Sequence, residues 1–84
     1  MDYDFEWDEA NEEKLLLRHF VRPEEVEQVF YNPPDVRRTG DVYLAVGHTN
    51  GGRLLLIVFE NHQQHIRPYS ARDLTPRERR RFSR

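Results

Sequence analysis

Residues 53–60 read RLLLIVFE, and within them Leu54 to Phe59 form the longest apolar run of the chain. This run does not alternate with polar residues, as it would in a strand with one face in water. An apolar run of this length between polar turns is typical of a strand that is covered on both faces. We therefore expect Leu54 to Phe59 to be the central strand of a sheet, with helices on at least one side.

Further strands are predicted on both sides of this run. Residues 42–46 have the alternating pattern of a strand, and the turn HTNGG at residues 48–52 joins them to the central strand as a β-hairpin. The Asn50-Gly51 pair is expected to supply the positive φ angles of that turn. A third strand is expected over residues 65–70, where a proline at position 68 removes a ladder donor and indicates an edge or a bulge. Residues 36–38 are a candidate for a short additional strand.

Two helices are predicted before the sheet. Asp8 is suited to cap a helix over residues 9–19, whose first turns are acidic and so complement the helix dipole. Pro23 is suited to the first position of a second helix, which Asn32 and the two following prolines end. The second helix has one apolar face, formed by Val26, Val29 and Phe30.

A short third helix is predicted at the end of the chain. Residues 75–78 read TPRE, which is a capping box with proline at the first helical position. The helix begins at Pro76 and is a basic arm with Phe82 as its large apolar anchor. The predicted fold is thus α+β over one domain, residues 1–84: two N-terminal helices on a small antiparallel sheet of three to four strands, with a short basic C-terminal helix.

The composition excludes several classes of protein. The chain has 84 residues and no Cys, which excludes a disulfide scaffold, a Cys-ligated metal site and a thiol nucleophile, and favours a reducing cytoplasm. No apolar run approaches the length of about 20 residues that a membrane-spanning helix needs. The acidic start MDYDFEWDE is unlike a secretory signal. We expect a cytoplasmic protein that does not enter a membrane.

The net charge of −2 hides a division of charge along the chain. Residues 1–35 carry eleven acidic and three basic residues, whereas residues 36–84 carry four acidic and ten basic residues, all of them Arg. Arginine binds phosphate with a planar fork of donors and stacks on bases, so a polyanion is one candidate partner. The alternative is that acidic helices pack beside a basic sheet for mutual stability.

Residues that could carry chemistry gather on the third predicted strand. By the two-residue period of a strand, His65, Arg67 and Tyr69 share one face. A general base, a cation and a phenol side by side suit an RNA backbone, and Arg53 and Arg72 could converge on them. The alternative is an exposed strand face with ordinary polar residues. The four histidines match no metal-ligand pattern, so no metal site is predicted.

Four stretches together resemble the BrnT toxins of bacterial type II toxin-antitoxin systems. The resemblance runs in order through nearly the whole chain and implies a RelE-like fold. It also implies ribonuclease activity without a metal or other cofactor, and neutralisation by a ribbon-helix-helix (BrnA-like) antitoxin that binds DNA. The stretches are FEWDE at 5–9, RHFVRPEEVEQVF at 18–30, GGRLLLIVFE at 51–60 and IRPYSARDLTPRERRRF at 66–82.

The resemblance assigns roles to individual residues unevenly. Arg18 and His19 stand where the family has a cation and an imidazole, although the glycine that follows in the family is Phe20 here. The family has arginines that are expected to bind or stabilise phosphate, and these match Arg53, Arg67 and Arg72. Trp7 also matches the family. The family typically has Tyr where this chain has Phe82, and Pro68 and Tyr69 replace aliphatic residues of the strand.

The first hypothesis is therefore a ribonuclease toxin that cleaves RNA through attack of the 2′-OH, without a divalent ion. The alternatives are a catalytically weak or inactive module that binds nucleic acid or an antitoxin, and a structural partner in an unrelated complex. A homodimer and a heterotetramer with the antitoxin are both left open. The candidate catalytic residues are Arg53, Arg67, Arg72, His19 and His65, and the candidate RNA-binding residues are Trp7, Arg18, Tyr69, Arg77 and Arg80.

Overall fold

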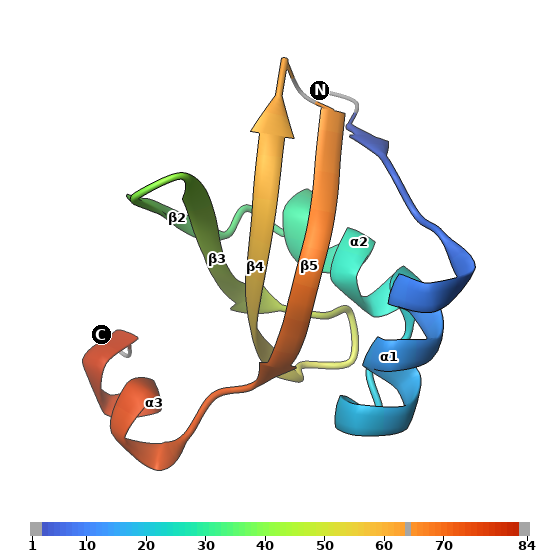
Figure 1. Ribbon diagram of the computed structural model, residues 1–84. Helices are drawn as coiled ribbons and strands as arrows, with labels where there is room; N and C mark the ends of the chain where they lie inside the picture. The colour runs from blue at the N-terminus through green and yellow to red at the C-terminus, as the bar shows by residue number, and fades with distance from the viewer. Residues whose placement is uncertain (1–2, 64, 83–84) are drawn as a thin grey trace.

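The computed structural model describes residues 3–63 and 65–82 and has a five-stranded sheet between two unequal helical layers. Helices α1 and α2 lie on one side of the sheet, whereas the short helix α3 lies apart from them, at the other side (Figure 1). The elements are β1 (Asp4–Phe5), α1 (Glu9–His19), α2 (Pro23–Tyr31), β2 (Asp35–Thr39), β3 (Val42–His48), β4 (Leu54–His62), β5 (His65–Asp73) and α3 (Pro76–Phe82).

The sheet is larger than predicted and is not purely antiparallel. Its strand order is β1-β5-β4-β3-β2, and β1 pairs with β5 in parallel through Asp4 and Phe5. The prediction of three to four antiparallel strands was therefore wrong, because a two-residue strand has no recognisable local pattern. The candidate strand over residues 36–38 is confirmed as β2, which pairs with β3.

Strand β4 is the centre of the sheet, as its apolar run predicted. Leu55, Ile57 and Phe59 are buried toward α1 and α2, and they join the larger of two core clusters. Leu56 points to the other side, where it forms a smaller cluster with Val46 and Leu74. Both faces of β4 are thus covered, which explains why its sequence does not alternate.

The two N-terminal helices begin and end where their capping residues predicted. A side-chain oxygen of Asp8 accepts a hydrogen bond from the Asn11 backbone N–H at 2.8 Å, and α1 runs over the predicted residues. Pro23 begins α2, whose buried residues are Val26, Val29 and Phe30. None of the three helices in the described part of the chain has the length and apolarity needed to cross a bilayer.

The β3–β4 hairpin is confirmed, but its turn differs from the prediction. The positive φ lies at Gly52 (89°), not at Asn50 or Gly51. The Gly52 N–H donates to the Thr49 carbonyl at 3.0 Å, and the Thr49 N–H donates to the Arg53 carbonyl at 2.9 Å. This is a three-residue loop with glycine in the left-handed position, so the prediction that Asn50-Gly51 supplies the positive φ angles was wrong.

Strand β5 contains the bulge that Pro68 predicted and continues beyond its predicted end. Pro68 pairs with Phe59 and Ser70 pairs with Val58, so Tyr69 is the extra residue at the register shift. The strand continues to Asp73, three residues past the predicted end at Ser70, because pairing with β4 continues after the bulge.

Helix α3 has the predicted capping box. The Thr75 N–H donates to a carboxylate oxygen of Glu78 at 2.9 Å, and the Glu78 N–H donates to the Thr75 hydroxyl at 3.2 Å. Phe82 packs against the smaller core cluster, and the Arg37 guanidinium lies 4.6 Å from the centre of its ring. Phe82 is therefore the apolar anchor that the sequence indicated.

Candidate nucleic-acid interface

The two faces of the sheet carry different chemistry. One face, which we name the helix face, is covered by α1 and α2, which pack on β5, β4 and β3. The opposite face is covered at one end by α3 and carries most of the candidate residues. We name this opposite surface the open face; its charged and polar side chains include Arg37, Glu60, His62, His65, Arg67, Tyr69 and Arg72.

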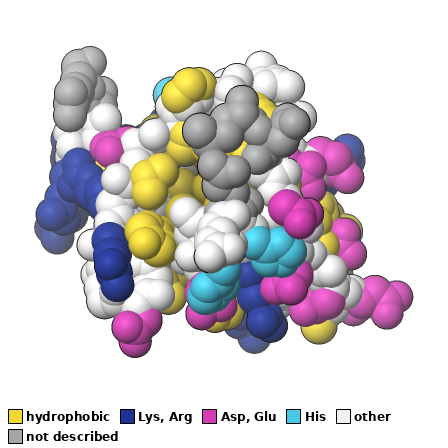
Figure 2. Space-filling view, turned by 90° about the horizontal axis from the view of Figure 1, so that it is seen from above, with side chains coloured by type: hydrophobic (Ala, Val, Ile, Leu, Met, Phe, Trp, Pro, Cys, Tyr) yellow, Lys and Arg dark blue, Asp and Glu magenta, His cyan; other side chains and the backbone are white. Residues whose placement is uncertain are grey.

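The division of charge along the sequence is also a division in space. Figure 2 shows basic side chains gathered on the side of β2 and α3, and acidic side chains gathered on the side of α1 and α2. Histidine side chains lie between them, beside acidic groups, at the end where β4 and β5 meet. An anion is therefore attracted more to the side of β2 and α3 than to the side of α1 and α2.

His65 and Arg67 form a cluster of opposite charges with the N-terminal strand. The two ring nitrogens of His65 lie 3.1 Å from an Asp4 carboxylate oxygen and 3.3 Å from one of Glu6. The Arg67 Nε lies 3.7 Å from the other oxygen of Glu6. The hydrogen bond with Glu6, followed by that with Asp4, raises the pKa of His65 above its ordinary 6.5. The open face thus has an imidazole and a guanidinium side by side in this region, both beside the Glu6 carboxylate.

Arg72 is held by helix α3. Its two terminal nitrogens donate to the two carboxylate oxygens of Glu78 at 2.7 and 2.9 Å, and one also donates to the Asp73 carbonyl at 3.1 Å. The hydrogen bonds from Arg72 hold the pKa of Glu78 at about 2, well below its ordinary 4.5. A phosphate that binds Arg72 must therefore compete with Glu78, which also caps α3.

Tyr69 and Glu60 form a further pair on the open face, and Glu60 was not among the predicted site residues. The interaction with the Glu60 carboxylate raises the pKa of the Tyr69 phenol above its ordinary 10.0. In the sheet register Glu60 lies opposite Arg67. The sequence signal for Glu60 was only its position at the end of the apolar run, because the residue opposite it depends on the register of the β4–β5 hairpin.

Arg53 lies on the opposite face of the sheet from Arg67 and Arg72. Its guanidinium donates to Asp73 at 2.8 and 2.9 Å, and to the carbonyls of Phe20 at 2.7 Å and His19 at 3.0 Å. A Glu25 carboxylate oxygen lies 3.3 Å away. The expectation that Arg53 converges on the strand face of Arg67 was wrong, because Arg53 shares its side of β4 with Leu55. Arg53 instead ties the end of α1 to the sheet.

Three other candidate residues also lie in the helical layer. The Trp7 indole N–H donates to Glu27 at 2.8 Å, and its ring packs partly buried against the larger core cluster. His19 is the half-buried last residue of α1, and Arg18 beside it is exposed. The structure does not bring these three side chains to the open face. Arg77 and Arg80, by contrast, are exposed on α3, on the side of the open face.

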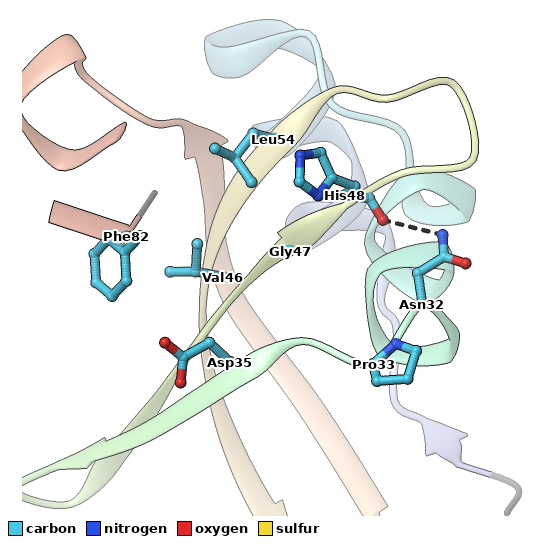
Figure 3. A pocket seen from close by; sticks show the side chains of 8 residues that line it. All are labelled: Asn32, Pro33, Asp35, Val46, Gly47, His48, Leu54 and Phe82. Carbon is cyan, nitrogen blue, oxygen red and sulfur yellow. Dashed lines mark hydrogen bonds between the residues drawn. The ribbon is translucent and has the colours of Figure 1, made fainter. Parts of the chain in front are cut away.

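A cavity of about 350 Å³ lies beside the anchor of α3. Figure 3 shows Phe82, Val46 and Leu54 around it on one side, and Asn32, which donates to the His48 carbonyl at 3.1 Å, on the other. It is lined by no arginine or lysine, so it offers no charged group for a phosphate. No group of three or more His, Asp or Glu side chains close enough to hold a metal ion occurs in the described residues.

Comparisons with known proteins identify the family and the fold. The model of the family described as "Ribonuclease toxin, BrnT, of type II toxin-antitoxin system" matches residues 7–78. The fold is similar to the crystal structure of the Brucella abortus ribonuclease toxin BrnT, with a TM-score of 0.74 and 19% identity over 88% of this chain and 99% of that chain. Among curated proteins, none matches this sequence. Because the family model spans most of its length, the chain belongs to the BrnT family of ribonuclease toxins of type II toxin-antitoxin systems.

Proposed function

We propose that this protein is an endoribonuclease that cleaves RNA on the open face of its sheet, by attack of the 2′-OH on the adjacent phosphate and without a divalent ion. The observation that carries the proposal is the grouping of His65, Arg67 and Arg72 on a face that α1 and α2 leave uncovered, in a chain of the BrnT family. The products would be a 2′,3′-cyclic phosphate and a 5′-hydroxyl. We also propose that it acts in the cytoplasm, where RNA is present, and that its fold is RelE-like.

Arginine is suited to this reaction because the transition state concentrates negative charge on the phosphate oxygens. Arg67 is half-exposed, and its ion pair with Glu6 at 3.7 Å is long, so a phosphate can replace that carboxylate. Arg72 is held more tightly by Glu78. We assign phosphate binding first to Arg67, with Arg72 as the second cation and the exposed Arg77 and Arg80 of α3 as contacts for the flanking backbone.

The remaining sequence candidates take other roles in this proposal. Arg53 and Trp7 hold the helical layer to the sheet through Asp73 and Glu27, so they maintain the fold. His65 serves as a cation or proton donor, because a ring that meets a carboxylate at each nitrogen is stabilised in its protonated form. His19 and Arg18 lie in the helical layer and are not assigned to the reaction.

The test is cleavage of a short RNA by purified protein in EDTA, with two arginine variants compared. Arg67→Ala should lose about 100-fold in rate, whereas Arg38→Ala should cleave like the wild type. Arg38 is a matched control because it is an exposed arginine on the helix-face side of the edge strand β2, with its guanidinium 5.8 Å from the Tyr43 ring centre. Cleavage that requires Mg²⁺, or equal rates in the two variants, would contradict the proposal.

A second candidate function is favoured by the ion pairs of the open face. Both Arg67 and Arg72 already have carboxylate partners, Glu6 and Glu78, and a face neutralised in this way could bind a partner without catalysis. RNA binding without cleavage in the same experiment would support such a catalytically inactive module. Growth arrest on induction in cells separates the two functions, since a pure binding module should be tolerated.

We further propose that a ribbon-helix-helix antitoxin neutralises the protein by covering the open face around Arg67 together with α3. The arginines of α3 are exposed. The helix is held to the sheet by Glu78, which pairs with Arg72 of β5, and by Phe82, which packs against the smaller core cluster. Deleting residues 76–84 should weaken antitoxin affinity at least tenfold, about 1.4 kcal/mol. Unchanged affinity in a truncated protein that is folded by circular dichroism would move the antitoxin contact to α1 and α2.

A further inference from the structure

The two edges of the sheet are covered to different extents. At one edge, β1 pairs with β5, and the Asn11 side chain of α1 donates to the Pro68 carbonyl of β5 at 3.5 Å. At the other edge, β2 pairs with β3 on its inner side, and no strand in the described part of the chain follows it (Figure 1). Every residue of β2 is exposed. Strand β2 is therefore the sheet edge that is open to a partner.

The hydrogen-bond pattern of the sheet determines which backbone groups of β2 face outward. Opposite residues of antiparallel strands alternate between pairs that exchange backbone hydrogen bonds and pairs that do not. The Thr49 N–H donates to the Arg53 carbonyl across the β3–β4 hairpin, so the odd-numbered residues of β3 bond to β4 and the even-numbered ones to β2. Val36 and Arg38 of β2 lie opposite odd-numbered residues of β3. Their N–H and C=O groups consequently point away from β3, toward the solvent.

The charged side chains of β2 do not block this edge. Exposed charges commonly protect an edge strand against pairing with another chain. Here the Arg37 guanidinium lies 4.6 Å from the centre of the Phe82 ring, and the Arg38 guanidinium lies 5.8 Å from that of Tyr43. The two guanidinium groups thus lie over opposite faces of the sheet, and the backbone edge between them stays accessible.

An apolar hollow adjoins β2 on the helix-face side. It is a cavity of about 380 Å³ lined by Tyr3, Phe30, Tyr31, Pro33, Pro34 and Val36. Val36 is on this side because it lies opposite Ala45, which belongs to the larger core cluster. Val36 is 47% exposed and Tyr31 is 51% exposed. A strand added along β2 places a side chain beside Val36, where an apolar group is removed from water.

The open-face side of β2 is basic, and this decides the chemistry of the partner. Arg37 packs there on Phe82 of α3. The exposed arginines of this helix are Arg77, Arg79, Arg80 and Arg81. A second copy of the chain paired along β2 would bring two such helices together, so charge repulsion opposes a dimer of this kind. An acidic segment is attracted to the same side (Figure 2).

We propose that β2 binds an extended, acidic segment of a partner protein, which pairs with its outer edge as an additional strand. Alternate side chains of this segment are acidic toward Arg37 and apolar toward Val36. RNA is attracted to the basic side as well, but it has no peptide backbone to continue the ladder of hydrogen bonds. The site does not depend on cleavage of RNA, and it lies beside the surface proposed above for the antitoxin.

The test uses the whole protein and two capped peptides of about eight residues, in which Val alternates with Glu or with Lys. Amide hydrogen exchange, measured by NMR, reports the pairing directly. The Glu peptide should slow exchange of the Val36 amide at least about tenfold, because that N–H gains a backbone acceptor. The Arg37 amide should change little, since Arg37 lies opposite Leu44 and is already bonded to β3. The Lys peptide should leave both amides unchanged.

Two variants at one position separate backbone pairing from side-chain contact. Val36→Pro removes the outward N–H and keeps an apolar side chain, and an edge strand accommodates proline where the N–H faces solvent. Val36→Thr keeps the N–H and nearly the same shape. Affinity for the Glu peptide should fall at least about tenfold in Val36→Pro and less than about threefold in Val36→Thr. Circular dichroism establishes that both variants are folded.

The opposite results overturn the proposal. If about 1 mM Glu peptide leaves the Val36 amide unprotected, or binds to α3 instead, the added strand is excluded. Equal protection by the Lys peptide removes the acidic chemistry, and protection that grows with protein concentration alone assigns the edge to a second copy. Equal affinities of the two variants exclude backbone pairing; should Val36→Pro fail to fold, exchange of the wild-type amide decides. Cleavage of RNA by the wild type is measured separately, so the ribonuclease proposal stands or falls on its own.

Discussion

The two faces of the sheet use arginine in opposite ways. On the helix face, Arg53 is 28% exposed and its guanidinium is surrounded by two carboxylates and two backbone carbonyls at the end of α1. On the open face, Arg67 is 46% exposed and has a carboxylate 3.7 Å away. The first arginine is committed to holding elements of the fold together, whereas the second can exchange its partner for a ligand. For Arg53 and Arg67, the face on which the strand position places the side chain decides which partners it has.

The apolar residues of β4 also differ between the two faces of the sheet. The largest expected effect on stability tests this difference. Phe59→Ala removes a ring that is 2% exposed and packs edge-on against Phe30, so it should lower the free energy of unfolding by about 3–5 kcal/mol. Val58→Ala, on the open face of the same strand, should cost about 1 kcal/mol, because Val58 is only partly buried. Urea denaturation of both variants measures the difference. Equal losses would mean that the two faces are equally packed.

The two arginines should separate stability from activity. Arg53→Ala removes the donors to Asp73 and to the end of α1, and should cost about 2 kcal/mol of unfolding free energy while the folded fraction keeps its cleavage rate. Arg67→Ala should change stability by less than about 0.5 kcal/mol and abolish most cleavage. Denaturation curves and initial rates on the same samples give both quantities. If Arg53→Ala and Arg67→Ala each lost both stability and cleavage rate, the two faces would not differ in how they use arginine.

The Arg72–Glu78 pair should weaken only in strong acid. Because the pKa of Glu78 is depressed from 4.5 to about 2, its contribution to stability is fully present above 4.5 and is lost as pH falls through about 2. The NMR signals of the Phe82 ring should therefore respond to pH with a midpoint near 2. In Arg72→Ala the midpoint should rise toward 4.5, and an unchanged midpoint would show that the pair does not hold α3.

The smallest effect is expected at His65, the first residue of β5, which lies between β1 and β4 in the sheet. Its pKa is raised by Glu6 and Asp4, so the stabilisation is fully present below 6.5 and is lost as pH rises through the higher pKa of the folded state. An NMR titration of the His65 ring should give a midpoint above 6.5. Glu6→Gln should lower that midpoint more than Asp4→Asn, since the hydrogen bond with Glu6 is the larger cause. The reverse order would contradict the geometry of β1 against β5.

The helices and the central strand could be predicted because local chemistry determines them. Asp8, Pro23 and the TPRE capping box each act within one turn of helix, and all three helix starts are confirmed. Strand β1 could not be predicted, because its two residues are ordered by pairing with β5, about 60 residues away in the chain. The same applies to the end of β5, which depends on continued pairing with β4 after the bulge.

The faces of the candidate residues were predictable only in part. Alternation places Arg53 with Leu55 and Ile57, and Glu60 with Leu56 and Val58, but an apolar run without alternation does not reveal which of these faces the helices cover. The sequence therefore grouped His65, Arg67 and Tyr69 correctly on one strand and assigned Arg53 to the wrong side.

The central claim is that the open face, and not the helix face, receives RNA. The direct test is NMR of the isotope-labelled protein during titration with a 2′-O-methyl oligoribonucleotide, which binds like RNA but lacks the attacking hydroxyl. We predict that the largest shift changes occur at His65, Arg67, Tyr69 and Arg72 and on α3, with little change on α1 and α2. Changes concentrated on α1 and α2, around Arg18 and His19, would contradict the account.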